Sequence, residues 1–373
     1  MVARLVALLV IAAGSAASAS FSSSASVNPY WIKELCAYGE EPGVWRELPN
    51  QQGMVFPNGG HLPQLIDTNT SFVGGRYELL NKDCQLKNRF KEYLFDPPPT
   101  ADAKPLHIAF FGDSVDSQTL EHTCWTDARE HGQNTTLVPH WQSTADCFAQ
   151  GLTCLTPGSH WELNMCMIRR AHMYGRVVPS LHPDFNYSAT GFKPMPYLFE
   201  QSREFMLNNS GTDPDFIMLG VHFWELGHLV DGMRPVEGIT DDTRILPTWF
   251  VDIELQRYSE AVMMMRKVFP KSLILIRTVA PPLHDLESGR SVTHKHWSHR
   301  MWIGQMNAIV RAIARKHNIP LVDMGLMAEG FVPQQIISPG DSHHPAQWLN
   351  LEAFNVALNI YHDYKQAKEL LRR

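Results

Sequence analysis

The stretch LHIAFFGDSVDSQ at residues 106–118 constrains what this chain can fold into more than any other. Its apolar run predicts a buried strand that stops at Gly112, where a glycine permits the tight turn that other residues resist. The turn would bring Ser114 to the end of a sheet, and a serine hydroxyl there is a nucleophile if a base can take its proton. Asp113 is expected to hold the turn, and Asp116 to cap the helix that follows.

The candidate base lies far downstream, in the stretch DSHHP at residues 341–345. Asp341 and His344 are three positions apart, so one turn can place the carboxylate beside the imidazole while the other ring nitrogen faces Ser114. His343 is the neighbouring alternative for the base. A competing interpretation makes Asp341 a cap of the closing helix and the two histidines ordinary loop residues.

From residue 215 onward, the chain alternates between apolar runs and amphipathic patterns. The apolar runs predict strands at residues 215–221, 272–278 and 319–324. The amphipathic patterns predict helices at residues 251–268, 299–317 and 346–371. Apolar strands separated by helices predict an α/β fold in which helices flank a parallel central sheet. In such sheets the reactive cleft lies beyond the carboxyl ends of the strands, where Ser114 would lie.

Two regions before residue 213 lack sustained periodicity. Residues 30–100 have glycine and proline punctuation and two cysteines, and are predicted to form an N-terminal cover pinned by a disulfide onto the sheet. Residues 130–212 show no pattern for a long helix and are predicted to be an irregular insertion that lines a cleft. Residues 30–372, which include this cover and this insertion, are expected to form one domain.

The N-terminal segment has the features of a secretory signal: Arg4, a short apolar core and Ala17-Ser18-Ala19 as a cleavage site. Residues 1–19 are therefore expected to be a signal peptide and residues 20–29 a flexible leader, which leaves no transmembrane segment in the mature chain. An uncleaved anchor is the alternative, although the apolar run is shorter than the ~20 residues that cross a bilayer. The expected localisation is the secretory pathway, either secreted or in the Golgi or ER lumen.

Cysteines and glycosylation sequons agree with an oxidising compartment. The six cysteines are an even number and predict up to three disulfides, whose connectivity the sequence leaves open. They are Cys36, Cys84, Cys124, Cys147, Cys154 and Cys166. Four sequons predict a glycoprotein, at Asn69, Asn134, Asn186 and Asn208.

Charge and composition exclude several classes of partner. The formal net charge is −6 and no long basic block is present, which argues against nucleic acid and anionic membranes as partners. The histidine-rich stretch at residues 293–299 has no carboxylate or cysteine at a familiar ligand spacing, so no metal site is predicted there. We expect no cofactor.

The GDS motif after a first strand, with an Asp-x-x-His pair before the final helix, resembles the SGNH/GDSL superfamily of ester-handling enzymes. More narrowly, the chain resembles trichome-birefringence-like proteins and related PC-esterases, which modify O-acetyl groups of polysaccharides. This resemblance implies an SGNH-hydrolase-like three-layer sandwich. It also implies that Ser114 is the nucleophile, His344 the base and Asp341 the acid that orients the base.

The resemblance extends to the oxyanion hole, with one departure. The Ser114 backbone N–H is one expected donor, and the strand end at Gly220 is a second. The superfamily commonly has an asparagine near that glycine, whereas this chain has Leu219 before it and Val221 and His222 after it. His222 is the candidate substitute. Phe223 and Trp224 follow and are candidates for stacking on sugar rings.

These observations predict an enzyme that transfers an O-acetyl group to a hydroxyl of a glycan or polysaccharide through an acyl-Ser114 intermediate. A secreted carbohydrate acetylesterase with the same three residues is the close alternative, because only the acceptor differs. A glycan-binding glycoprotein without turnover is the alternative from another class. The expected partners are the glycan and an acyl donor; the sequence does not fix the oligomeric state.

Overall fold

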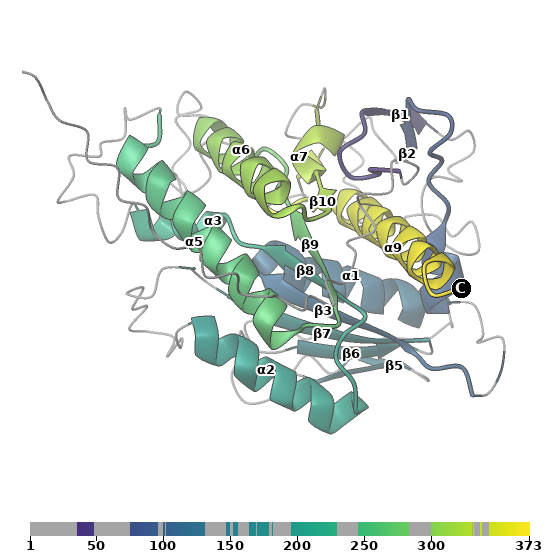
Figure 1. The fold of residues 1–373 in the computed structure, drawn as a ribbon. Helices are drawn as coiled ribbons and strands as arrows, with labels where there is room; N and C mark the ends of the chain where they lie inside the picture. The colour runs from purple at the N-terminus through teal and green to yellow at the C-terminus, as the bar shows by residue number, and fades with distance from the viewer. Residues whose placement is uncertain are drawn as a thin grey trace, which may run out of the picture.

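A parallel sheet between two layers of helices forms the centre of the protein (Figure 1). The computed structural model describes residues 36–47, 75–95, 100, 102–130, 147–149, 152–155, 164–168, 170–178, 181, 195–229, 245–282, 300–329, 331, 336–337 and 343–373. Within these residues, the main sheet has eight strands in the order β10-β9-β8-β3-β7-β6-β5-β4.

Five neighbouring strands of this sheet run parallel to one another. In chain order they are β3 (Leu106–Gly112), β7 (Ala171–Val177), β8 (Phe216–Gly220), β9 (Leu273–Arg277) and β10 (Leu321–Val322). The first of them, β3, lies between the second and the third, so the strand order reverses between β3 and β8. Ligands of open α/β sheets bind beyond the carboxyl ends of the strands at such a reversal. The fold therefore places the expected cleft beside Gly112 and Gly220, where β3 and β8 end.

Helices cover both faces of the sheet, which confirms the expected α/β class with a central sheet flanked by helices (Figure 1). On one face, α1 (Ser114–Glu130) packs against α9 (Gln347–Leu370). On the other face, α5 (Thr248–Val268) packs between α2 (Met195–Ser210) and α6 (Arg300–His317). Two short helices follow strand ends, α3 (Phe223–His228) after β8 and α7 (Met324–Met327) after β10.

The segment expected to lack a long helix is more regular than its sequence indicates. It contains α2, and its strand β7 pairs in parallel with β3 inside the central sheet. The sheet then continues in antiparallel pairing through three strands, β6 (Asn164–Ile168), β5 (Leu152–Leu155) and β4 (Cys147–Ala149). The prediction of no long helix is therefore wrong, and so is the description of this segment as irregular in these parts.

In its described residues, the N-terminal cover contains an antiparallel pair of strands and a short π-helical turn. These elements are β1 (Gly43–Glu47), β2 (Gly75–Leu79) and η3 (Lys91–Phe95). A disulfide joins Cys36 to Cys84. Both cysteines belong to the cover, so the expectation that a disulfide pins the cover onto the sheet is wrong. Noncovalent contacts attach the cover instead: the Asp323 N–H donates to the Gly39 carbonyl at 3.0 Å, and the Trp45 indole donates to the Met327 carbonyl at 2.6 Å. The Trp45 ring also lies 4.8 Å from that of Trp348.

Several sequence predictions fall outside the described residues. They are the signal peptide at residues 1–19, the leader at residues 20–29, the sequons at Asn69, Asn134 and Asn186, and the histidine-rich stretch at residues 293–299. The side chains of the four remaining cysteines are also outside what the structure describes. Asn208 of the fourth sequon is exposed on α2.

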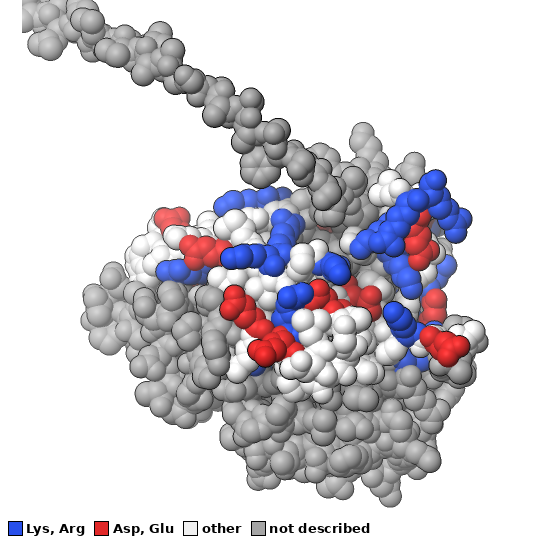
Figure 2. Space-filling view, turned by 60° about the horizontal axis from the view of Figure 1, so that its bottom comes forward, with Lys and Arg blue, Asp and Glu red and all other residues white. Residues whose placement is uncertain are grey.

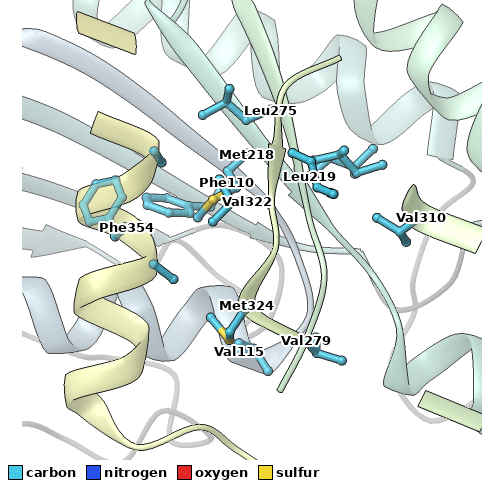
Figure 3. Packing of buried hydrophobic residues seen from close by; sticks show 14 of the residues in the cluster. Phe110, Val115, Met218, Leu219, Leu275, Val279, Val310, Val322, Met324 and Phe354 are labelled. Carbon is cyan, nitrogen blue, oxygen red and sulfur yellow. The ribbon is translucent and has the colours of Figure 1, made fainter. Parts of the chain in front are cut away.

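The core forms where the sheet meets α9 and α1. Every residue of β3 is buried, and the Phe110 ring lies 5.3 Å from the ring of Phe354 on α9 (Figure 3). Val115, the second residue of α1, is completely buried in the same cluster. Because β3 and the start of α1 are held in this core, the backbone that carries Ser114 has little freedom to move.

In the described residues no helix has the length and apolar character needed to cross a membrane. Nor do three or more histidine, cysteine, aspartate or glutamate residues of this part of the chain gather as metal ligands. On the face drawn in Figure 2, basic and acidic side chains are intermixed over the described surface. This mixed surface agrees with the small formal charge of −6.

Glu254 is a buried acid on α5, and it makes the stability of the fold depend on pH. Burial raises its pKa from 4.5 to about 8, and the charge of Arg257 opposes this only in part. The folded protein thus holds this proton more tightly than the unfolded chain does. The resulting stabilisation is complete below pH 4.5 and is lost as the pH rises through about 8.

Glu254→Gln is therefore expected to stabilise the protein in alkaline conditions, because glutamine keeps the shape without the ionisation. Relative to wild type, the free energy of unfolding of the variant should rise by about 2–4 kcal/mol between pH 4 and pH 8. Urea unfolding at the two pH values measures this change. Glu260→Gln, a half-exposed position on the same helix, is the matched control. An equal pH-dependent gain in that control would contradict the assignment to Glu254.

Candidate active site

Ser114 lies on a sharp turn between β3 and α1. The strand ends at Gly112, the helix begins at Ser114, and only Asp113 lies between them. A side chain at Gly112 is excluded, because a Cβ there would lie 1.6 Å from Asp116 Oδ2 and 2.6 Å from the carbonyl oxygen of Gly220. The turn thus requires glycine for reasons of space.

Asp113 holds this turn together through both its backbone and its side chain. Its backbone N–H donates to the Gly220 carbonyl at 3.1 Å, and its Oδ1 accepts the N–H of Val115 at 3.0 Å. Its own carbonyl accepts the N–H groups of Asp116 and Ser117. Three of the first four N–H groups of α1 are therefore engaged by Asp113. In the part of the chain that the structure describes, the Ser114 N–H has no acceptor, so it is available at the positive end of a helix.

The Ser114 hydroxyl meets a histidine from the other end of the chain. Ser114 Oγ lies 2.5 Å from His344 Nε2, and the two residues are 230 positions apart in the sequence. Both side chains are half-buried, and His344 lies directly before α9. With the proton of a neutral imidazole on Nδ1, Nε2 accepts the hydrogen bond from the serine. This is the geometry in which a histidine can remove the proton of a nucleophilic serine.

The neighbours of His344 differ in how the structure describes them. Asp341 lies outside the described residues, so its role as the orienting acid stays a prediction. The His343 ring lies 4.0 Å from that of His344, with the two rings tilted, and 4.9 Å from the edge-on ring of Phe223. In the structure it is His344, not His343, that contacts Ser114. His343 and Phe223 instead support the loop that presents the base.

The residues expected to bind sugar or an oxyanion lie at the carboxyl end of β8. Phe223 is buried, with 3% of its surface exposed, and Trp224 is half-buried. The His222 ring is fully buried, and neither of its nitrogens has a hydrogen-bond partner among the described residues. The His222 backbone N–H approaches Asp113 Oδ2 at 3.4 Å. Burial, assisted by the charge of Arg277, lowers the pKa of His222 to about 3, so the ring is neutral.

Arg277 is a site residue that the sequence did not assign. It ends β9, and its side chain is fully buried against the elbow. The guanidinium forms a bidentate pair with Asp116, through Nε to Oδ1 at 2.7 Å and Nη2 to Oδ2 at 2.5 Å. Asp116 therefore does not cap the helix as expected; Asp113 does. The sequence signal was a single charge at the end of the otherwise apolar strand LILIR.

No protein-family model and no curated protein matches the chain. Similar solved structures include a putative GDSL-like lipase from Parabacteroides merdae, with 11% identity and a TM-score of 0.35, covering 72% of this chain and 100% of the lipase. A peptidoglycan O-acetylesterase has 12% identity and a TM-score of 0.34, and the match covers 73% of this chain and 93% of the esterase. A family 3 carbohydrate esterase from Clostridium thermocellum has 14% identity and a TM-score of 0.33, covering 72% of this chain and 98% of the esterase.

These similarities are low both in identity and in TM-score, so the function has to be argued from the site itself. The fold and the site define an α/β protein with a serine–histidine pair on a strand-to-helix elbow. That pair lies at the carboxyl end of the central strand, beside the reversal of strand order.

Proposed function

We propose that the protein forms an acyl-Ser114 intermediate and passes the acyl group, an acetyl group, to a hydroxyl of a glycan. The observation that carries this proposal is the 2.5 Å contact between Ser114 Oγ and His344 Nε2 on the elbow. A serine without such a base is a weak nucleophile near neutral pH, whereas a serine paired with histidine can attack an ester carbonyl.

Acylation uses the residues around the elbow. As Ser114 Oγ attacks the carbonyl carbon of the donor ester, its proton moves to His344 Nε2. The carbonyl oxygen becomes an oxyanion, which the Ser114 N–H and the positive end of α1 can stabilise. The intermediate collapses, the bond to the leaving alcohol breaks, and that alcohol takes the proton from His344. Asp341 is proposed to orient His344 during these proton transfers.

Deacylation repeats these steps with a new alcohol. His344 removes the proton of an acceptor hydroxyl, whose oxygen attacks the acetyl carbonyl, and the proton then returns to Ser114 as the ester bond to the protein breaks. A sugar hydroxyl as acceptor makes the protein a transferase, and water makes it a carbohydrate acetylesterase. The preference for a sugar is supported by the resemblance of the GDS and Asp-x-x-His motifs to PC-esterase-type proteins. The half-buried Trp224 near the strand end is a candidate contact for the sugar ring.

The test separates these acceptors directly. The purified protein is given an activated aryl acetate with and without a deacetylated oligosaccharide, and both free acetate and acetylated oligosaccharide are quantified. Transfer predicts acetylated oligosaccharide as the main product, with little acetate formed in its absence. Rapid release of acetate that the oligosaccharide does not change would replace the transferase proposal with an esterase. Binding of oligosaccharide without either product would favour the non-catalytic glycoprotein.

A further inference from the structure

The Arg277 side chain reaches the elbow from two strands away. Arg277 ends β9, whereas Ser114 follows β3, and β8 lies between these strands. The guanidinium passes the end of β8 at Gly220, where Nη2 lies 3.4 Å from the Gly220 carbonyl oxygen. It then contacts both acidic residues of the elbow, because the same Nη2 also lies 3.0 Å from Asp113 Oδ1.

Two facing glycines make room for this contact. Gly112 and Gly220 are register partners at the ends of β3 and β8. A Cβ at Gly220 would lie 2.6–2.7 Å from three atoms of the Arg277 side chain, and a Cβ at Gly112 would overlap the carboxylate of Asp116. The missing side chains thus form the space in which the arginine and the aspartate meet. The paired glycines and the buried ion pair are parts of one arrangement.

The arrangement controls the atoms that the proposed reaction uses. Asp113 Oδ1 accepts from both Arg277 and the N–H of Val115, the residue that follows the nucleophile. Asp116 lies one position further along the first turn of α1 and is clamped by the same guanidinium. Arg277 therefore holds the backbone on both sides of Ser114, including the N–H that faces the oxyanion and the Cα that aims Oγ at His344.

We propose that Arg277 is a positioning residue for the acyl-transfer reaction: through Asp113 and Asp116 it fixes the elbow so that Ser114 presents Oγ and N–H in reactive geometry. This inference rests on the proposed function. Positioning of this kind affects kcat more than KM, because a displacement of about 1 Å at the reacting atoms can cost about 10²-fold in rate.

The electrostatics of the cluster keep the Arg277 guanidinium charged. Burial lowers the pKa of Arg277, but the attraction of Asp116 and Asp113 outweighs this effect and holds the pKa above its ordinary value, so the guanidinium stays charged. Burial raises the pKa of Asp116 to about 7, and Arg277 opposes the rise. Removal of Arg277 would therefore leave Asp116 without its main stabilising charge. A neutral residue at position 116 should relieve that cost.

The test compares Arg277→Lys and Arg277→Met with Ser114→Ala in the activated-acetate assay, and records kcat, KM and the urea-unfolding free energy. Lysine keeps the charge but loses the bidentate contact, and is expected to lower kcat by about 10-fold with KM close to wild type. Methionine is expected to lower kcat by about 10²-fold. The double variant Arg277→Met/Asp116→Asn should recover stability but not kcat, which a purely structural role would not predict.

Arg311→Lys is the matched control, since Arg311 forms a comparable bidentate pair with Asp323 at the same edge of the sheet. It should lose stability without the fall in kcat. A fall in kcat equal to that of Arg277→Lys, or full activity of the double variant, would overturn the inference. So would wild-type kcat in both Arg277 variants while Ser114→Ala is inactive, and that outcome leaves the proposed function in place. Wild-type turnover in Ser114→Ala overturns the proposed function and this inference together.

Discussion

Ser114→Ala is expected to lower kcat for ester turnover by about 10⁴-fold or more while the protein stays folded. The large effect follows because the variant removes the oxygen on which the proposed acyl intermediate forms, so water has to attack the ester directly. The change is small in volume and removes no core contact, because Ser114 is half-buried. Steady-state kinetics with an activated acetate and far-UV circular dichroism measure the two effects.

Ser259→Ala is a control of the same chemical kind. Ser259 Oγ lies 2.7 Å from His317 Nε2, in a serine–histidine contact between α5 and α6 that is not on an elbow. This variant should keep wild-type kcat, because the contact ties two helices together and faces no strand end. Substantial residual turnover in Ser114→Ala would rule out Ser114 as the nucleophile, and equal losses in the two variants would point to a general loss of structure.

His344→Ala is expected to have the second-largest effect, a fall in kcat of about 10²- to 10⁴-fold. The serine remains, but its proton has no acceptor at 2.5 Å, so attack on the ester is slow. Because the imidazole acts on the serine proton and does not hold the ester, KM should change little. The same activated-acetate assay, with kcat and KM separated, measures this outcome.

Two further histidine variants make the assignment specific. His343→Ala should lower kcat less than His344→Ala, since the His343 ring packs beside its neighbour but does not contact Ser114. His317→Ala should leave kcat unchanged. The opposite ranking of the two adjacent histidines would identify His343 as the base and would contradict the contact seen in the structure.

Much of the central fold was predictable because its strands and helices have clear local patterns of apolar residues. The apolar runs that gave β8 and β9 are continuous, and the amphipathic pattern at residues 251–268 gave α5 with its end correct. A strand whose residues are all buried can be recognised from its own apolar run, without knowing which strands lie beside it. The elbow was predictable for the same reason, since β3 stops where the glycine stands.

Polar residues interrupt the apolar patterns of the elements that the sequence did not predict. Strand β7 carries His172, whose ring stacks 4.9 Å from that of His107 on the neighbouring strand. This contact accommodates a polar residue within the sheet. Helix α2 buries Ser202, whose hydroxyl donates to the Leu198 carbonyl at 2.6 Å and interrupts the apolar period. The ring that stacks on His172 belongs to a different strand, so a window of neighbouring residues does not show it. The Ser202 bond is local, but it satisfies a buried polar group that breaks the apolar pattern.

The candidate site likewise contains residues that the sequence predicted and one that it did not. The order of the GDS and Asp-x-x-His motifs predicted that Ser114 and His344 would meet, and they lie in contact. Their catalytic roles, and that of Asp341, remain predictions. Arg277 could not be assigned, because its part depends on the missing Cβ of Gly220 on another strand. A lone arginine at the end of an apolar strand was the one available signal.

The most direct test of the central claim is the intact mass of the protein, rapidly quenched after exposure to an activated acetyl ester, with Ser114→Ala measured in parallel. The account predicts that wild type gains the mass of one acetyl group, that peptide mapping places it on Ser114, and that the variant gains none. Decay of this adduct on addition of an oligosaccharide, and not in water alone, is expected for the transferase. An adduct of equal yield in Ser114→Ala, or none in correctly folded wild type that turns over the ester, would contradict the acyl-Ser114 intermediate.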